Sequence, residues 1–167
     1  MSILSRPPLL PVIIGTGFGA GFWPWGPGTA GAVVATALWF GLHTILDFAA
    51  LQAVTVILIL VFTILGTWAT RRLMPFWGDD PHRVVVDEMV GVWVALLAVP
   101  DWRSAQLSPD DWQAALAALL LFRFFDIVKP LGIRALDRRR GAFWVMADDL
   151  LAGVYAAFVL LLFIFIA

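Results

Sequence analysis

Residues 48–69 read FAALQAVTVILILVFTILGTWA, an uncharged apolar run as long as the α-helix that a bilayer crossing needs. Arg71 and Arg72 follow it closely. Hydrophobic residues make up 62% of the 167-residue chain and charged residues 14%, and the mean hydropathy is +0.92. Such a chain has more apolar surface than its own core could hide. We therefore expect an integral membrane protein.

Four more apolar stretches are expected to be helical. Their approximate bounds are residues 31–46, 80–99, 112–129 and 148–166. Some are short for a full span of about 20 residues. The Gly- and Pro-rich stretch before them, up to residue 30, predicts a loop or a re-entrant segment. The predicted fold is all-α: a polytopic membrane bundle of about four to five hydrophobic helices after this segment, in one domain of residues 1–167.

The overall charge and the cysteine content narrow the classes of function. The formal net charge is −1, so nothing in the composition suggests a nucleic-acid partner. The chain has no Cys, which excludes disulfides, thiolate metal sites and a cysteine nucleophile. The chemistry must therefore depend on other side chains.

The basic residues predict the orientation of the chain, because short cytoplasmic loops carry an excess of Lys and Arg. If each predicted helix carries the chain from one side of the membrane to the other, eight arginines lie on the same side: Arg6, Arg71, Arg72, Arg83, Arg134, Arg138, Arg139 and Arg140. Arg103 and the C-terminus fall on the other side. This orientation was derived from the basic residues alone. It nevertheless places eight acidic residues at the cytoplasmic face: Asp79, Asp80, Asp87, Glu88, Asp126, Asp137, Asp148 and Asp149.

Local spacing brings several of these acids together. The Asp-Pro pair at 80–81 is expected to begin a helix, with Asp80 as its N-cap. Asp87 lies seven residues after Asp80, so both would share one helix face, with Glu88 next to it. The last helix is expected to open with the Asp-Asp pair at 148–149, where the helix dipole favours anions.

Carboxylates without His or Cys companions are ligands for a hard cation, Mg²⁺ or Mn²⁺, rather than Zn²⁺. Phosphate oxygens and water usually complete a Mg²⁺ site. Asp126 has Arg123 one turn before it and Lys129 three residues after it. These two cations, together with Arg83, could neutralise the charge of a bound phosphate. The pattern indicates metal-assisted phosphate chemistry.

Simpler interpretations exist for each feature. Asp80 could be only an N-cap, and Asp126 only an ion-pair partner. The run 138–140 is interpreted as a topology determinant and lipid-surface anchor. Asp79 and Asp137 are expected to be solvated charges. The alternative function is a small cation or proton transporter, which predicts acids spread through the depth of the membrane.

Four blocks of the sequence, in this order and at these intervals, resemble the phosphatidylglycerophosphatase A family. They cover nearly the whole chain and read GTGFGAGFWPWGPGTAG, DPHRVVVDEMVG, FRFFDIVKPLGIR and MADDLLAGVYA. The resemblance implies a multi-pass enzyme of the bacterial inner membrane whose active site faces the cytoplasm. It implies removal of the terminal phosphate of phosphatidylglycerophosphate, a phospholipid, with Mg²⁺ as cofactor.

The resemblance also assigns roles to residues of this chain. The expected catalytic groups are Asp80, Asp87, Asp126, Lys129 and Asp149. The expected metal ligands are Asp87, Glu88, Asp126, Asp148 and Asp149. The substrate is expected to contact Arg123, Lys129 and Thr29, and the charge argument above adds Arg83 to these contacts. Whether water or a carboxylate attacks the phosphorus stays open at this point.

Overall fold

The structure is a computed structural model that describes residues 6–101, 111–130 and 132–166. Within these ranges the chain forms helices and no strand. The helices are α1 (Leu9–Gly15), η1 (Ala20–Phe22, a 3₁₀ turn), α2 (Pro27–Ile45), α3 (Phe48–Trp77), α4 (Val86–Leu96), α5 (Asp111–Val128), α6 (Ile133–Asp137) and α7 (Ala142–Ile166). The predicted all-α class is confirmed, and α2, α3, α4, α5 and α7 are its hydrophobic helices. Arg103 lies outside the described residues.

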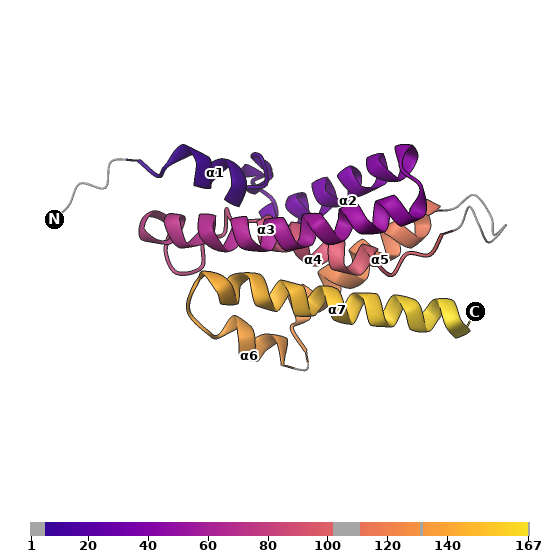
Figure 1. The fold of residues 1–167 in the computed structure, drawn as a ribbon. Coiled ribbons are helices and arrows are strands. Elements are labelled where there is room, and N and C mark those ends of the chain that lie inside the picture. Colours follow the sequence, from indigo (N-terminus) through magenta and orange to yellow (C-terminus); the bar gives the residue numbers. More distant parts are fainter. Residues whose placement is uncertain (1–5, 102–110, 131, 167) are drawn as a thin grey trace.

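Three of these helices, α2, α3 and α7, are long and apolar enough to cross a membrane. The short helix α4 lies at the centre of the bundle and packs against α2, α3, α5 and α7 (Figure 1). Nearly every side chain of α4 is buried, as a helix surrounded by others requires. The indole N–H of Trp93 donates to the carbonyl of Ala35 at 3.0 Å, which fixes α4 against α2.

The helices α4 and α7 approach closely because each has a glycine at the crossing point. A Cβ atom on Gly153 of α7 would collide with the carbonyl oxygen of Gly91 on α4. A Cβ atom on Gly91 would lie 2.7 Å from the carbonyl oxygen of Asp149. The first turn of α4 and the second turn of α7 are thereby brought close together.

The described part of the Gly- and Pro-rich start, residues 6–26, does not form one continuous helix, as the sequence predicts. The short helix α1 packs on α3, and η1 packs on α2. Between them, the Thr16 hydroxyl donates to the carbonyl of Val12 at 2.7 Å and accepts from the N–H of Gly19 at 3.1 Å.

Two predicted helix starts are wrong. The third predicted helix begins at Val86 and not at Asp80, which lies in the loop after α3. The backbone N–H of Val85 donates to the carbonyl of Gly15 at 2.8 Å, so tertiary pairing with the α1 loop holds residues 81–85 out of the helix. The last helix begins at Ala142, so Asp148 and Asp149 lie in its second turn.

The two ends of the bundle differ (Figure 1). The end of α3, the short helix α6 and the start of α7 lie at one end. The connection between α2 and α3 and the C-terminus lie at the other. The helix α3 reaches the first end by continuing past Arg71, Arg72 and Pro75 to Trp77, beyond the apolar run that predicted it.

Candidate active site: an acidic pocket at one end of the bundle

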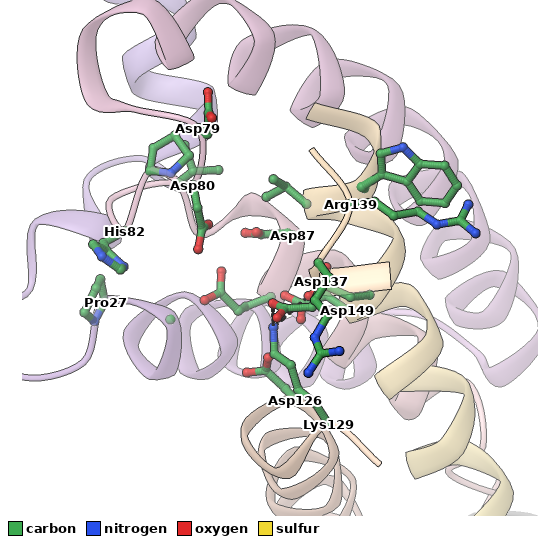
Figure 2. A pocket seen from close by; sticks show the side chains of 18 of the residues that line it. Pro27, Asp79, Asp80, His82, Asp87, Asp126, Lys129, Asp137, Arg139 and Asp149 are labelled. Carbon is green, nitrogen blue, oxygen red and sulfur yellow. Dashed lines mark hydrogen bonds and ion pairs between the residues drawn. The ribbon is translucent and has the colours of Figure 1, made fainter. Parts of the chain in front are cut away.

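A pocket of about 610 Å³ opens at the end of the bundle where α3 finishes and α7 begins. Its walls come from the start of α2, the loop before α4, the first turn of α4, the end of α5, the segment around α6 and the first turns of α7. All eight acids that the sequence places on one side line it: Asp79, Asp80, Asp87, Glu88, Asp126, Asp137, Asp148 and Asp149. Figure 2 shows several of these side chains directed toward the same space.

The innermost acids are Asp87, Glu88 and Asp149. Each offers a carboxylate oxygen, and the three oxygens lie within 4.8 Å of one another. Asp87 is 8% exposed and Asp149 is 4% exposed. Burial raises the pKa of the Asp87 carboxyl well above its usual value, and the adjacent Glu88 raises it further. Like charges this close and this buried repel unless a proton or a cation lies between them.

The donor set of this cluster fits a divalent hard cation. Oδ1 of Asp87, Oε2 of Glu88 and Oδ1 of Asp148 are buried, and each lacks a hydrogen-bond partner among the described residues. Buried polar atoms of this kind normally have a partner. Oxygen-only ligands from two rigid helices match the preference of Mg²⁺, which also takes ligands from water and phosphate.

Two cations in the pocket are already paired with carboxylates. Nη1 of Arg123 donates to Oδ2 of Asp126 at 2.5 Å, one helical turn away on α5. Nζ of Lys129 donates to Oδ2 of Asp148 at 2.8 Å and also to Oδ1 of Asp137. Burial alone would lower the pKa of Lys129, but the hydrogen bonds and charges of these two carboxylates raise it more. Lys129 therefore stays charged.

The mouth of the pocket carries more exposed groups. Asp80 and His82 come from the loop before α4, and Asp80 points into the pocket (Figure 2). Asp79 lies 3.5 Å from Arg140, in an ion pair with both side chains mostly exposed. This part of the site can exchange partners with solvent or with a ligand.

Two of the predicted substrate contacts do not line the pocket. Thr29 is exposed on the first turn of α2, although the neighbouring residues 26–28 do line it. The guanidinium of Arg83 lies 5.7 Å from the ring centroid of Phe22 and 6.0 Å from that of Trp77. The Arg83 side chain therefore packs against these two rings and is not part of the pocket wall.

Five residues that were not expected to belong to the site do line the pocket: Asp79, Asp137, Arg138, Arg139 and Arg140. Asp137 is an ion-pair partner of Lys129 rather than a merely solvated charge. The run 138–140, interpreted above as a lipid-surface anchor, also lies on the pocket wall. The sequence does contain one indication that residues 137–140 belong to the site, because they lie between Lys129 and the Asp-Asp pair of α7.

Comparison with known proteins shows which family and which bacterial proteins this sequence is similar to. The sequence model of a family described as Phosphatidylglycerophosphatase A matches residues 13–164. A Bacteroides thetaiotaomicron protein, provisionally named a phosphatidylinositol-3-phosphatase, is 53% identical over 92% of both chains. Proteins named phosphatidylglycerophosphatase A are 36% identical in Haemophilus influenzae, over 88% of this chain and 84% of the relative, and 32% identical in Escherichia coli, over 89% and 80%. No solved structure matches this chain.

Proposed function

Because this chain belongs to the phosphatidylglycerophosphatase A family, we propose that it hydrolyses the terminal phosphomonoester of phosphatidylglycerophosphate in the acidic pocket. The products are phosphatidylglycerol and inorganic phosphate. The observation that carries the proposal is the buried cluster of Asp87, Glu88 and Asp149 in a pocket that also holds Lys129 and Arg123. A transporter would need acids through the depth of the membrane, whereas these acids gather at one end of the bundle.

We also propose that Asp87, Glu88 and Asp149 hold a Mg²⁺ ion, and that the unpartnered Oδ1 of Asp148 can add to this set. Bound there, the ion would supply positive charge that polarises the phosphoryl group. Asp126, also a predicted ligand, has one oxygen paired with Arg123 and so has a second function in orienting that guanidinium.

The side chains of the pocket supply the remaining parts of a hydrolysis. Lys129 and Arg123 each retain N–H donors beyond those paired with carboxylates, and these donors can bind phosphate oxygens. The N-terminus of α2, which lines the pocket at residues 26–28, favours an anion as well. These groups hold the phosphate while the ester bond is cleaved.

Asp80 is the group proposed to move the proton. It is exposed at the mouth, points into the pocket, and has no ion pair within the described part of the chain. It accepts a proton from a water molecule whose oxygen bonds to phosphorus while the P–O ester bond breaks. Asp80 then returns this proton to the departing lipid oxygen, which becomes a hydroxyl. A carboxylate nucleophile is the alternative, and trapping a phosphorylated aspartate would identify it.

Phosphate release from phosphatidylglycerophosphate by the protein purified in detergent tests this proposal. We expect chelation to abolish release, added Mg²⁺ to restore it, and Asp87→Asn to lower kcat on the order of 100-fold. Asp47→Asn is the matched control, because Asp47 caps α3 at the opposite end and Asn caps equally well. Full activity of Asp87→Asn, or of the chelated enzyme, would refute the mechanism.

The Bacteroides relative favours a second candidate substrate, a phosphorylated phosphatidylinositol, because its identity to this chain is the higher one. Both lipids carry a phosphomonoester on a polar head group, so the same pocket chemistry serves either. Measuring kcat/KM for both lipids in identical mixed micelles separates the candidates. A preference of tenfold or more for the inositol lipid, about 1.4 kcal/mol in transition-state binding, would replace phosphatidylglycerophosphate as the substrate.

A further inference from the structure

Three consecutive arginines, Arg138, Arg139 and Arg140, lie at the mouth of the acidic pocket. They connect α6 to α7, and the segment ends at Gly141, whose φ of 122° requires a glycine-like backbone. All three are exposed, and all three line the pocket. They are therefore positioned to contact a ligand that already occupies the pocket.

These arginines are not neutralised by the acids beside them. The guanidinium of Arg139 lies 4.3 Å from the ring centroid of Trp144. Among the described residues, Arg140 pairs only with Asp79, and an exposed ion pair of this kind contributes little. Arg138 has no ion pair in the described part of the chain. By contrast, the inner cations Lys129 and Arg123 are bonded to carboxylates.

Stacking on Trp144 determines what Arg139 can bind. A guanidinium that lies on an aromatic ring keeps its N–H donors in its own plane, where they can reach an anion at the edge. Figure 2 shows Arg139 beside the indole ring and on the side of the acids away from His82. The mouth thus offers a preorganised cationic edge, separate from the carboxylate cluster.

We propose that Arg138, Arg139 and Arg140 form a second anion subsite, which binds a phosphodiester while the phosphomonoester occupies the acidic cluster. This inference rests on the proposed function, because the lipid substrates considered there carry both groups. The pocket volume of about 610 Å³ lies in the range that accommodates a whole small molecule rather than one phosphate. Guanidinium groups bind phosphate oxygens in pairs, which suits them to this task.

A diester could come from the substrate or from a neighbouring anionic lipid. Two water-soluble compounds remove the membrane from the test: glycerophosphoglycerophosphate, which is the deacylated head group with both phosphates, and glycerol 3-phosphate, which has the monoester alone. For Arg138→Gln and Arg139→Gln we expect KM to rise about tenfold more for the head group than for glycerol 3-phosphate. Trp144→Leu should also raise the KM for the head group relative to the KM for glycerol 3-phosphate, but by a smaller factor than the arginine substitutions do.

Arg71→Gln is the matched control. Arg71 is exposed on α3, carries the same charge and does not line the pocket. Equal KM changes for both compounds, or changes no larger than those of Arg71→Gln, would overturn the subsite. An effect that appears only when anionic lipid is added to the micelles would overturn the substrate diester as its ligand and identify the neighbouring lipid instead.

Binding without turnover separates this inference from the proposed function. Glycerophosphoglycerol contains the diester and no monoester, so calorimetric titration with it needs no catalysis. Wild-type binding that is weakened about tenfold in Arg139→Gln supports the subsite even in a preparation that releases no phosphate. Binding unchanged in Arg138→Gln and Arg139→Gln would refute the subsite, whereas failure to release phosphate from any phosphorylated lipid would refute the proposed function.

Discussion

Lys129 joins three elements through one ammonium group. It directly follows the last residue of α5, and its side chain bonds to Asp137 of α6 and Asp148 of α7. Its backbone φ of 49° is unusual for a residue with a side chain, and Pro130 follows it directly. A conformation of this kind persists only where the surrounding contacts support it. Asp137 is thus a residue that positions Lys129 as well as one that neutralises it.

A double-mutant cycle tests this function of Asp137. We expect Lys129→Met to lower kcat on the order of 100-fold, because a phosphate contact is lost and the buried Asp148 loses its counter-charge. Asp137→Asn alone should cost less. In the Lys129→Met background, Asp137→Asn should cost nothing further, which gives a coupling free energy of about 1 kcal/mol or more. Additive losses in phosphate release would contradict the positioning role.

The helix α2 contributes to the site through the absence of a side chain at Gly28. A Cβ atom there would collide with the Glu88 carboxylate and lie 3.2 Å from Nη1 of Arg123. Gly28→Ala should therefore displace Glu88 and lower kcat by up to about 100-fold, because small misplacements of catalytic groups are costly.

Gly41→Ala is the control on the same helix. A Cβ atom on Gly41 meets no atom within 4 Å. That change should leave phosphate release intact and stabilise α2 by up to about 1 kcal/mol, since Ala is the better helix former. Melting temperature in detergent and phosphate release, measured on both variants, check the pair. Full activity of Gly28→Ala would show that Glu88 tolerates displacement.

Element types were predictable from the sequence, and some element boundaries were not. Each hydrophobic helix corresponds to a run of many apolar residues, so these helices could be recognised from the sequence. The start of α4 depends on a hydrogen bond between Val85 and Gly15, which no local pattern reports. The start of α7 was misplaced because acids favour helix N-termini, whereas here Asp148 and Asp149 lie one turn further in, facing α4 and α5.

The acids of the candidate site were predictable as a group for a related reason. Basic loops determine sidedness, and sidedness alone placed all eight acids together. What the sequence could not supply was which charges pair with which. Asp137 resembles any exposed acid until Lys129 is known to turn back toward it. The run 138–140 resembles any topology signal until α6 folds it against the pocket.

At the scale of the whole molecule, an apolar exterior surrounds a bundle in which eight of the twelve acidic residues line a pocket at one end. Large hydrophobic side chains such as Leu60, Ile64 and Phe165 are exposed along α3 and α7. A water-soluble protein rarely exposes so much contiguous apolar surface, whereas lipid would cover it. We therefore expect the charged pocket to lie toward one membrane surface, and we propose the cytoplasmic one because basic residues lie near it.

Site-directed labelling tests this orientation without ambiguity, because the natural chain has no Cys. Ala135→Cys places a thiol on α6 near the pocket, and Thr44→Cys places one at the far end of α2; both positions are exposed and neither change alters a charge. In cells with an intact cytoplasmic membrane, a membrane-impermeant maleimide should label Thr44→Cys and not Ala135→Cys. After permeabilisation both should react. The reverse pattern would place the pocket outside the cell, where the lipid phosphatase would meet substrate only in the outer leaflet.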